Sequence, residues 1–231
     1  DPHAAIDEGG GGVHEGDAAE HEPPPHAVSD DRLGGGQLHA VVDLLDLHGL
    51  AHLVRLDAAG RDGEADEVRD HYLEVIGEVQ RRGVACEPSI KLTQLGLDVD
   101  REAAYRNALA IGRRAMEAGS YFWVDMEQSS YVDVTLDMVS RLRHDVPRLG
   151  IALQAYLHRT ADDAARMIRE GIGIRLVKGA YSEPAAVAFP KKADVDANYV
   201  ALAKMMMAPA SRAHGSRAVF GTHDTAIINT L

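Results

Sequence analysis

The sequence predicts an α/β fold of the (β/α)8 TIM barrel type, with the barrel incomplete in this chain. Short, almost continuous apolar runs alternate with segments of helical periodicity, as buried parallel strands and their crossover helices require. The centres of these runs lie near positions 90, 123, 152, 176 and 219, a mean spacing of about 32 residues. A barrel of roughly 250 residues with eight βα units has a spacing of about 31. A doubly wound dinucleotide-binding sheet fits less well, because the chain contains no G-x-G-x-x-G.

The first expected element is an amphipathic helix over residues 65–79. Its apolar side chains recur at helical spacing on one face: Val68, Tyr72, Val75, Ile76 and Val79. A second helix is expected over residues 101–118, and the glycine at position 119 is a typical helix stop.

Five strands are expected from the apolar runs. They cover residues 89–92, 121–124, 151–153, 174–177 and 218–220. The four runs after the first are short and nearly continuously apolar, which is typical of strands covered on both faces. The pattern therefore predicts a parallel sheet buried under helices.

The first 64 residues differ in composition from the rest of the chain. They hold 14 acidic and 3 basic residues, 7 of the 12 histidines and no aromatic residue. Gly- and Pro-rich stretches set among charges offer too little apolar surface to offset the entropy lost on ordering. We expect an atypical, largely disordered segment over residues 1–64 and the barrel domain over residues 65–231. The scattered histidines lack the paired spacing of metal ligands, so no metal site is predicted.

The charge balance restricts the function classes. With 24 basic and 36 acidic residues and a net charge of -12, the chain lacks the basic surface of a nucleic-acid-binding protein. A single cysteine excludes an intramolecular disulfide, and no secretory signal or membrane-spanning stretch is evident. We expect a cytoplasmic protein with no nucleic-acid partner.

Polar residues follow every expected strand. Lys91 lies within the first strand, and Asp125 and Gln154 follow the second and third. Arg175 lies within the fourth strand, which Lys178 follows, and residues 222–224 follow the fifth. The carboxyl ends of barrel strands form the active site in enzymes of this fold. Because desolvated cations need a paired anion, these residues indicate a site for a small carboxylate-bearing molecule.

At these residues the chain resembles the proline dehydrogenase family, in its small monofunctional bacterial form, over about residues 65–229. The motifs that carry the resemblance are SIKLTQLGL at 89–97, VDME at 124–127, LQAYL at 153–157, RLVKGAY at 175–181, AFPKKADVDANY at 188–199 and THD at 222–224. The resemblance implies an FAD-dependent barrel that oxidises L-proline to 1-pyrroline-5-carboxylate, the first step of proline catabolism. It also implies electron transfer to a quinone and leaves open a peripheral association with the inner face of the membrane.

The same resemblance implies roles for individual residues. Asp125 and Arg175 correspond to the family's catalytic pair, with Arg175 beside the flavin ring and Asp125 holding both Arg175 and Lys91. Lys91 corresponds to the lysine that binds the substrate carboxylate. The residues that correspond to flavin contacts are Met126, Gln154, Lys178, Gly179, Ala180, Thr222 and His223.

The resemblance also implies two βα units beyond the last residue of this sequence, with arginines that bind the proline carboxylate. At the other end, residues 53–57 occupy the place of the family's first strand but match it poorly. We therefore expect a fragment that, as written, is unable to oxidise proline at a useful rate. Two alternatives stay open: a truncated, non-catalytic remnant, and a Schiff-base lyase that uses Lys178 as its nucleophile.

Overall fold

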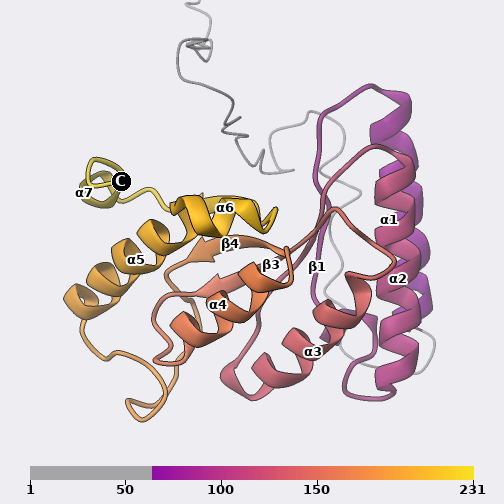
Figure 1. Ribbon diagram of the computed structural model, residues 1–231. Helices are drawn as coiled ribbons and strands as arrows, with labels where there is room; N and C mark the ends of the chain where they lie inside the picture. Colours follow the sequence, from indigo (N-terminus) through magenta and orange to yellow (C-terminus); the bar gives the residue numbers. More distant parts are fainter. Residues whose placement is uncertain (1–63) are drawn as a thin grey trace, which may run out of the picture. The chain divides into compact units, whose positions relative to one another are not determined.

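The computed structural model describes residues 64–231, which form a five-stranded parallel sheet and the helices around it (Figure 1). The strands lie in chain order, β1-β2-β3-β4-β5, and every neighbouring pair is parallel. The strands are β1 (Ser89–Ile90), β2 (Phe122–Val124), β3 (Leu149–Gln154), β4 (Gly173–Val177) and β5 (Ala218–Gly221). The helices are α1 (Glu64–Arg81), η2 (Thr93–Leu95), α2 (Arg101–Glu117), η3 (Ser129–Tyr131), α3 (Val132–Leu142), α4 (Thr160–Arg169), α5 (Lys192–Met207), α6 (Pro209–Ala213) and α7 (Thr225–Ile228).

All five strands expected from the apolar runs are present. β1 is shorter than predicted, because the chain turns into the 3-10 helix η2 soon after Ile90 and leaves that turn through Gly96, whose φ is 96°. β3 is longer than predicted, and all six of its residues are buried. Since β3 has a strand on each side and helices over one face, even its first residues are shielded from water.

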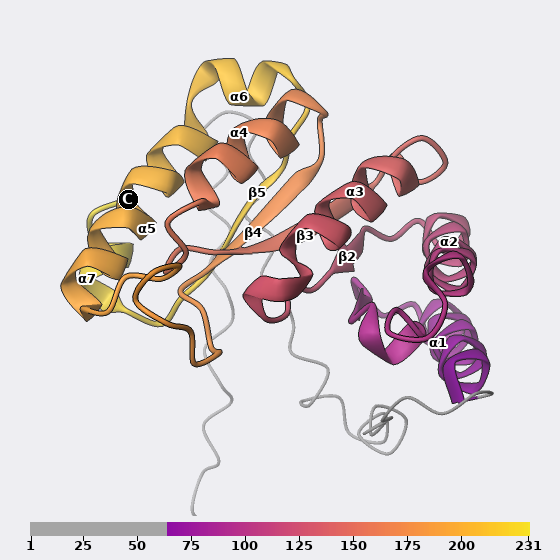
Figure 2. The same ribbon diagram turned by 90° about the horizontal axis from the view of Figure 1, so that it is seen from below.

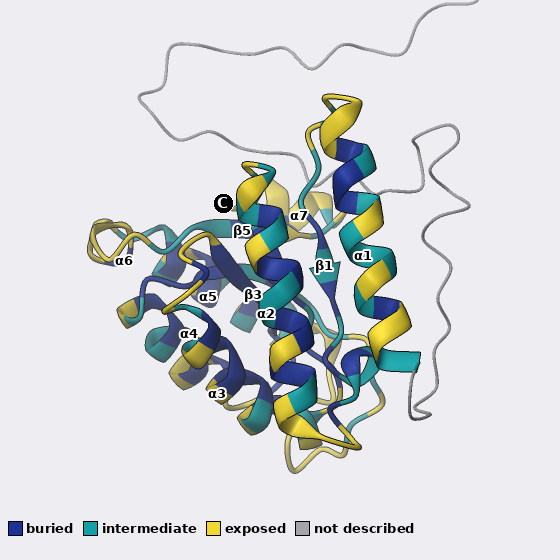
Figure 3. Cartoon of the chain, turned by 90° about the vertical axis from the view of Figure 1, so that its right-hand side faces the viewer, coloured by how far each residue is buried: buried dark blue, intermediate teal, exposed yellow. Residues whose placement is uncertain are grey.

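The helices cover the outer side of the sheet. Figure 2 shows α2, α3, α4 and α5 following one another along that side, and each packs on its neighbour and on a nearby strand. In α1 and α2 the sides turned toward the protein are buried and the outward sides are exposed (Figure 3). Asp100 caps the start of α2, and its carboxylate accepts from the backbone N–H groups of Glu102 and Ala103. The helix ends shortly before Gly119, whose φ is 75°.

The sheet is curled rather than flat. On a flat sheet, three strand spacings of about 4.8 Å would separate β1 from β4 by about 14 Å. Arg175 of β4 nevertheless donates to the Ser89 hydroxyl of β1 at 2.8 Å. Arg217, which precedes β5, likewise reaches Glu87, which precedes β1, at 2.7 Å. These contacts across the concave side are those of a partial barrel.

Small residues on the inner side of the sheet leave space for aromatic rings. A Cβ atom on Gly150 would lie 2.2 Å from Cζ3 of Trp123, and one on Gly173 would lie 2.3 Å from the hydroxyl of Tyr121. The alternate residues along each strand point outward and are buried beneath the helices. They include Ile90, Val124, Ile151, Leu153, Ile174 and Leu176. The inner side therefore holds the polar and aromatic groups, and the outer side holds the main core.

Two expectations lie outside the described residues: the acidic segment before Glu64 and the weak strand at 53–57. Within residues 64–231, no helix has both the length and the apolar character needed to cross a membrane.

Candidate functional site

A cavity of about 520 Å³ opens at the carboxyl ends of the strands. Its volume lies in the range of roughly 300–1,000 Å³ typical of small-molecule sites. The structure brings all ten sequence-predicted site residues into its lining: Lys91, Asp125, Met126, Gln154, Arg175, Lys178, Gly179, Ala180, Thr222 and His223. These residues come from all five strand ends, so the sheet's parallel order accounts for their meeting.

Arg175, Asp125 and Ser89 form a closed triangle of polar contacts. Arg175 Nη2 forms a close ion pair with Asp125 Oδ1 and donates to Ser89 Oγ at 2.8 Å, and Ser89 Oγ donates to the same Asp125 oxygen at 2.8 Å. The Arg175 and Asp125 side chains are 14% and 28% exposed. Because the pair is shielded from water but open to the cavity, its charge can act on a bound molecule.

A partly buried tyrosine supports this triangle from outside. The Tyr72 hydroxyl of α1 donates to the backbone carbonyl of Ser89 at 3.0 Å. Burial, together with the nearby negative charge of Asp125, raises the pKa of Tyr72 to about 12. The hydroxyl therefore stays protonated and remains a donor across the physiological pH range.

Lys91 lines the cavity differently from the sequence-based expectation. Asp125 was expected to hold both Arg175 and Lys91, but it contacts Arg175 and not Lys91. Within residues 64–231, the Lys91 ammonium has neither a hydrogen bond nor an ion pair. A half-buried cation without a protein anion is suited to bind an anionic group of a ligand.

Gln154 presents an unsatisfied polar atom to the same space. The residue is 3% exposed and ends β3, and its Oε1 atom has no hydrogen-bond partner in the described part of the chain. Buried polar groups are nearly always paired, so an unpaired one in a cavity wall favours a ligand that supplies the missing donor. Met126, which is 6% exposed, adds an apolar surface to the wall.

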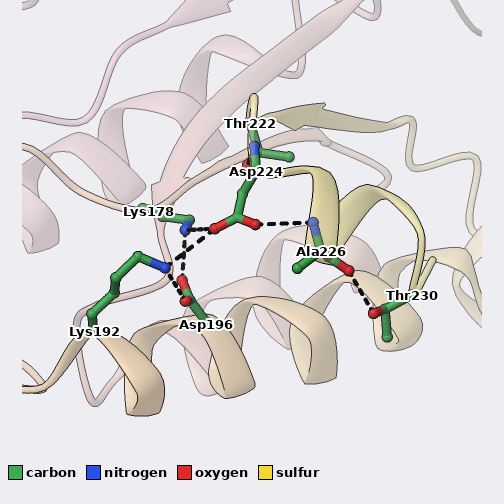
Figure 4. A network of polar contacts seen from close by, with 7 residues as sticks. All are labelled: Lys178, Lys192, Asp196, Thr222, Asp224, Ala226 and Thr230. Atoms are coloured by element: carbon green, nitrogen blue, oxygen red, sulfur yellow. Dashed lines mark hydrogen bonds and ion pairs between the residues drawn. The ribbon is translucent and has the colours of Figure 1, made fainter.

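Lys178 is held by two carboxylates (Figure 4). Its Nζ atom donates to Asp196 at 2.6 Å and to Asp224 at 2.8 Å, and the exposed Lys192 binds the same two aspartates. Asp224 also accepts from the backbone N–H of Ala226 at 3.1 Å, which caps α7. The cluster thus joins the loop after β4, the start of α5 and the segment after β5.

Gly179 follows Lys178 with a φ of 117°, a conformation open mainly to glycine. A Cβ atom there would lie 2.3 Å from the Tyr156 ring. The backbone of this loop is therefore pressed against Tyr156, and the next residue, Ala180, is exposed at the cavity.

We expect the Asp224→Asn variant to lose less of its free energy of unfolding than the wild type when the pH is lowered. Hydrogen bonds from Lys178 and then Lys192 hold the pKa of Asp224 below its ordinary value of 3.8. The folded pKa is lower than the unfolded one, so the stabilisation is present above pH 3.8 and is lost as the pH falls through the folded pKa. The difference in free energy of unfolding between wild type and variant should therefore shrink below about pH 4 in urea titrations.

The control for this experiment is Asp194→Asn, an exposed residue in the first turn of α5, the helix that carries Asp196. It should follow the wild-type pH curve. A constant difference between Asp224→Asn and wild type from pH 6 to pH 2 would contradict the assigned pairing.

Sequence reasoning missed four residues of this region as site members: Ser89, Tyr181, Asp196 and Asp224. Tyr181 and Asp224 line the cavity, Asp196 pairs with Lys178, and Ser89 completes the triangle. A signal existed for Ser89, because it lies two residues before Lys91 and alternate residues of a strand share a face. Asp224 was among the polar residues expected after the fifth strand but had no role assigned to it, and no signal in sequence distance pointed to Asp196.

Residues 51–230 match the sequence model of a family described as proline dehydrogenase. Proline dehydrogenase 1 of Bacillus subtilis (strain 168) is 34% identical over 197 residues, which cover 85% of this chain and 60% of that protein. The proline dehydrogenase of Deinococcus radiodurans is 35% identical over 170 residues, covering 71% of this chain and 53% of that protein. The chain therefore spans little more than half the length of these curated relatives.

Solved structures with a similar fold include proline utilization A (PutA) proteins. A mutant of PutA from Bradyrhizobium japonicum superposes with a TM-score of 0.68 at 23% identity, over 76% of this chain and 21% of that chain. PutA from Bdellovibrio bacteriovorus, inactivated by N-propargylglycine, gives a TM-score of 0.63 at 22% identity, over 72% and 22% of the two chains. This likeness confirms the predicted fold class, with five barrel strands in the described residues.

Proposed function

Because the chain belongs to the proline dehydrogenase family, we propose that this protein oxidises L-proline to 1-pyrroline-5-carboxylate with FAD as its cofactor. We further propose a quinone as the electron acceptor and residues 65–231 as the barrel domain that carries the site. Since quinones dissolve in the bilayer, this acceptor would require a peripheral contact with the membrane.

The observation that carries the proposal is the meeting of an unpaired lysine and a fixed arginine in one cavity. Lys91 lacks a protein anion among the described residues, and Arg175 is held by Asp125 and Ser89. Two cations and one carboxylate leave an excess of positive charge, which suits the carboxylate of an amino acid. Lys91 is the group that would bind it, as a compact point charge.

The residues present also fit a flavin. The orphaned Oε1 of Gln154 can accept a hydrogen bond from a ring N–H, and Met126 offers apolar surface beside it. On the other side, the loop at Gly179 and the residues Thr222 and His223 provide backbone and side-chain polar groups. A bound flavin would accept the hydride and its two electrons from the substrate.

The protein's own residues orient and polarise the reactants. Arg175 supplies a fixed positive charge in a shielded space, where it stabilises negative charge that develops during hydride transfer. Asp125 keeps this charge in place and partly balances it. The hydride leaves proline once its ring nitrogen has lost a proton, and that proton passes to solvent through the open side of the cavity.

A specific contact disfavours the Schiff-base lyase. A nucleophilic lysine needs an apolar pocket or a neighbouring cation to release its proton. Lys178 is instead tied to the carboxylates of Asp196 and Asp224, which occupy its ammonium as hydrogen-bond acceptors. Its position suits a structural cation better than a nucleophile.

The experiment uses the protein expressed from its complete reading frame. We expect a yellow protein with flavin absorbance that reduces an artificial dye when L-proline is added. L-Proline methyl ester should be a much poorer substrate, because it lacks the anion for Lys91. The same ester would be oxidised as well as proline if the cavity did not bind a carboxylate.

Two other outcomes would favour the alternatives. An adduct trapped on Lys178 by borohydride, without bound flavin, would favour the lyase. A folded protein that neither retains FAD nor reduces the dye would favour the non-catalytic remnant.

A further inference from the structure

Below the Arg175 triangle lies a second polar cluster, built around the fully buried Trp123 of β2. The indole Nε1 donates to Glu87 Oε2 at 2.7 Å, and Glu87 Oε1 accepts from Arg217 Nη1 at 2.7 Å. Glu87 precedes β1 and Arg217 precedes β5, so the cluster links the two edges of the sheet at their amino-terminal ends.

The indole has little freedom to rotate. One edge is tied to Glu87 through Nε1, and the opposite edge lies against Gly150, where a Cβ atom would come within 2.2 Å of Cζ3. Its ring is flanked by two guanidinium groups, with Arg175 at 5.3 Å and Arg217 at 5.7 Å from the ring centroid. Both distances lie within the range of about 6 Å at which a cation is attracted to an aromatic ring.

The Trp123 ring gives Arg175 a second point of contact, whereas the triangle with Asp125 and Ser89 holds it at one nitrogen only. The contacts of Arg175 to Asp125 and to Ser89 both use the same nitrogen, Nη2. A guanidinium held at one nitrogen can still swing about that point, which leaves the direction of its plane and of its remaining N–H groups unset. The Trp123 ring is a second constraint, located away from Nη2 and attached to a different strand from Arg175.

We propose that Trp123, anchored by Glu87, is a positioning residue that sets the orientation of Arg175 toward the reactants. Neither residue lines the cavity, so both act through Arg175. The expected effect of Trp123 on catalysis rests on the proposed function. The physical coupling of Trp123 to Arg175 stands on the contacts alone.

The test of the catalytic consequence is Trp123→Phe, which removes the Nε1 donor and part of the ring that faces Arg175. We expect kcat with L-proline to fall about tenfold, because a phenyl ring that is not anchored to Glu87 attracts and orients the Arg175 guanidinium less well. The KM for proline should change less than twofold, because Lys91 is untouched, and the flavin content should stay at the wild-type level.

The matched control is Phe122→Leu, at the neighbouring and equally buried position on the other side of the same strand. It should lower the thermal midpoint but leave kcat unchanged. A Trp123→Phe variant that loses stability as the control does and keeps its kcat would overturn the proposal. If Trp123→Phe does not fold, Glu87→Gln replaces it, with a threefold or larger loss of kcat expected and an unchanged kcat overturning the proposal.

A second measurement separates this inference from the proposed function. In urea unfolding of the flavin-free protein, Trp123→Phe and Arg175→Gln are combined in a double-mutant cycle. We expect their effects on the unfolding equilibrium constant to differ from additivity by a factor of about three or more. Additive effects overturn the coupling even if the protein oxidises proline, and non-additive effects support it even if the protein does not.

Discussion

Replacing Arg175 by lysine is expected to lower kcat for proline oxidation about 100-fold, the size of effect seen when a preorganised electrostatic group is lost. Lysine keeps the positive charge but has no planar group. It cannot bond Asp125 and Ser89 while also facing the Trp123 ring. Steady-state kinetics with L-proline and a dye acceptor measures the change.

The control for this prediction is Arg166→Lys in α4. Arg166 pairs with the two carboxylates of Asp137 and Glu170, outside the cavity. Exposed pairs contribute little to stability, so this variant should keep the wild-type rate and thermal midpoint. An Arg175→Lys enzyme with unchanged flavin reduction would contradict the role given to Arg175.

Gly179→Ala is expected to have the largest effect on the cavity wall itself. Its φ of 117° is costly for alanine, and the new Cβ would lie 2.3 Å from the ring of Tyr156, which is buried and cannot move away freely. Backbone strain of about 1–3 kcal/mol and overpacking of about 1–3 kcal/mol together predict a loss of about 2–6 kcal/mol in the free energy of unfolding. We also expect the purified variant to lose its flavin.

Gly119→Ala separates backbone strain from crowding. Gly119 also has a positive φ, 75°, but a Cβ atom there would meet nothing within 4 Å. Its substitution should cost only about 1–2 kcal/mol and leave flavin retention unchanged. Equal losses of stability in the two variants would show that the contact with Tyr156 is unimportant.

Much of the fold could be predicted because its signals are local. Each apolar run predicted a strand that is present, and the helix over residues 101–118 ends where the glycine at 119 indicates. The strand bounds were less accurate, since the ends of β1 and β3 depend on the turn at η2 and on burial by neighbouring strands. These are properties of the assembled sheet.

The gathering of the site residues was also predictable from parallel strand order. Polar residues at the carboxyl ends of parallel strands must meet at one edge, and all ten line one cavity. Their pairings were not predictable. Lys91 was expected to share Asp125 with Arg175, yet that carboxylate contacts Arg175 and Ser89.

The sequence by itself determined the alternation of strands and helices, the family and the set of residues around the cavity, because these depend on periodicity and on motifs within a few residues. Only the tertiary structure decided which charges are paired. Arg175 meets Ser89 across 86 residues of sequence, and Lys178 meets Asp224 across 46. The first contact arises from the curl of the sheet, which brings β1 and β4 face to face, and the second from the pairing of β4 with β5. Neither the curl nor the strand order has a local signature in the chain.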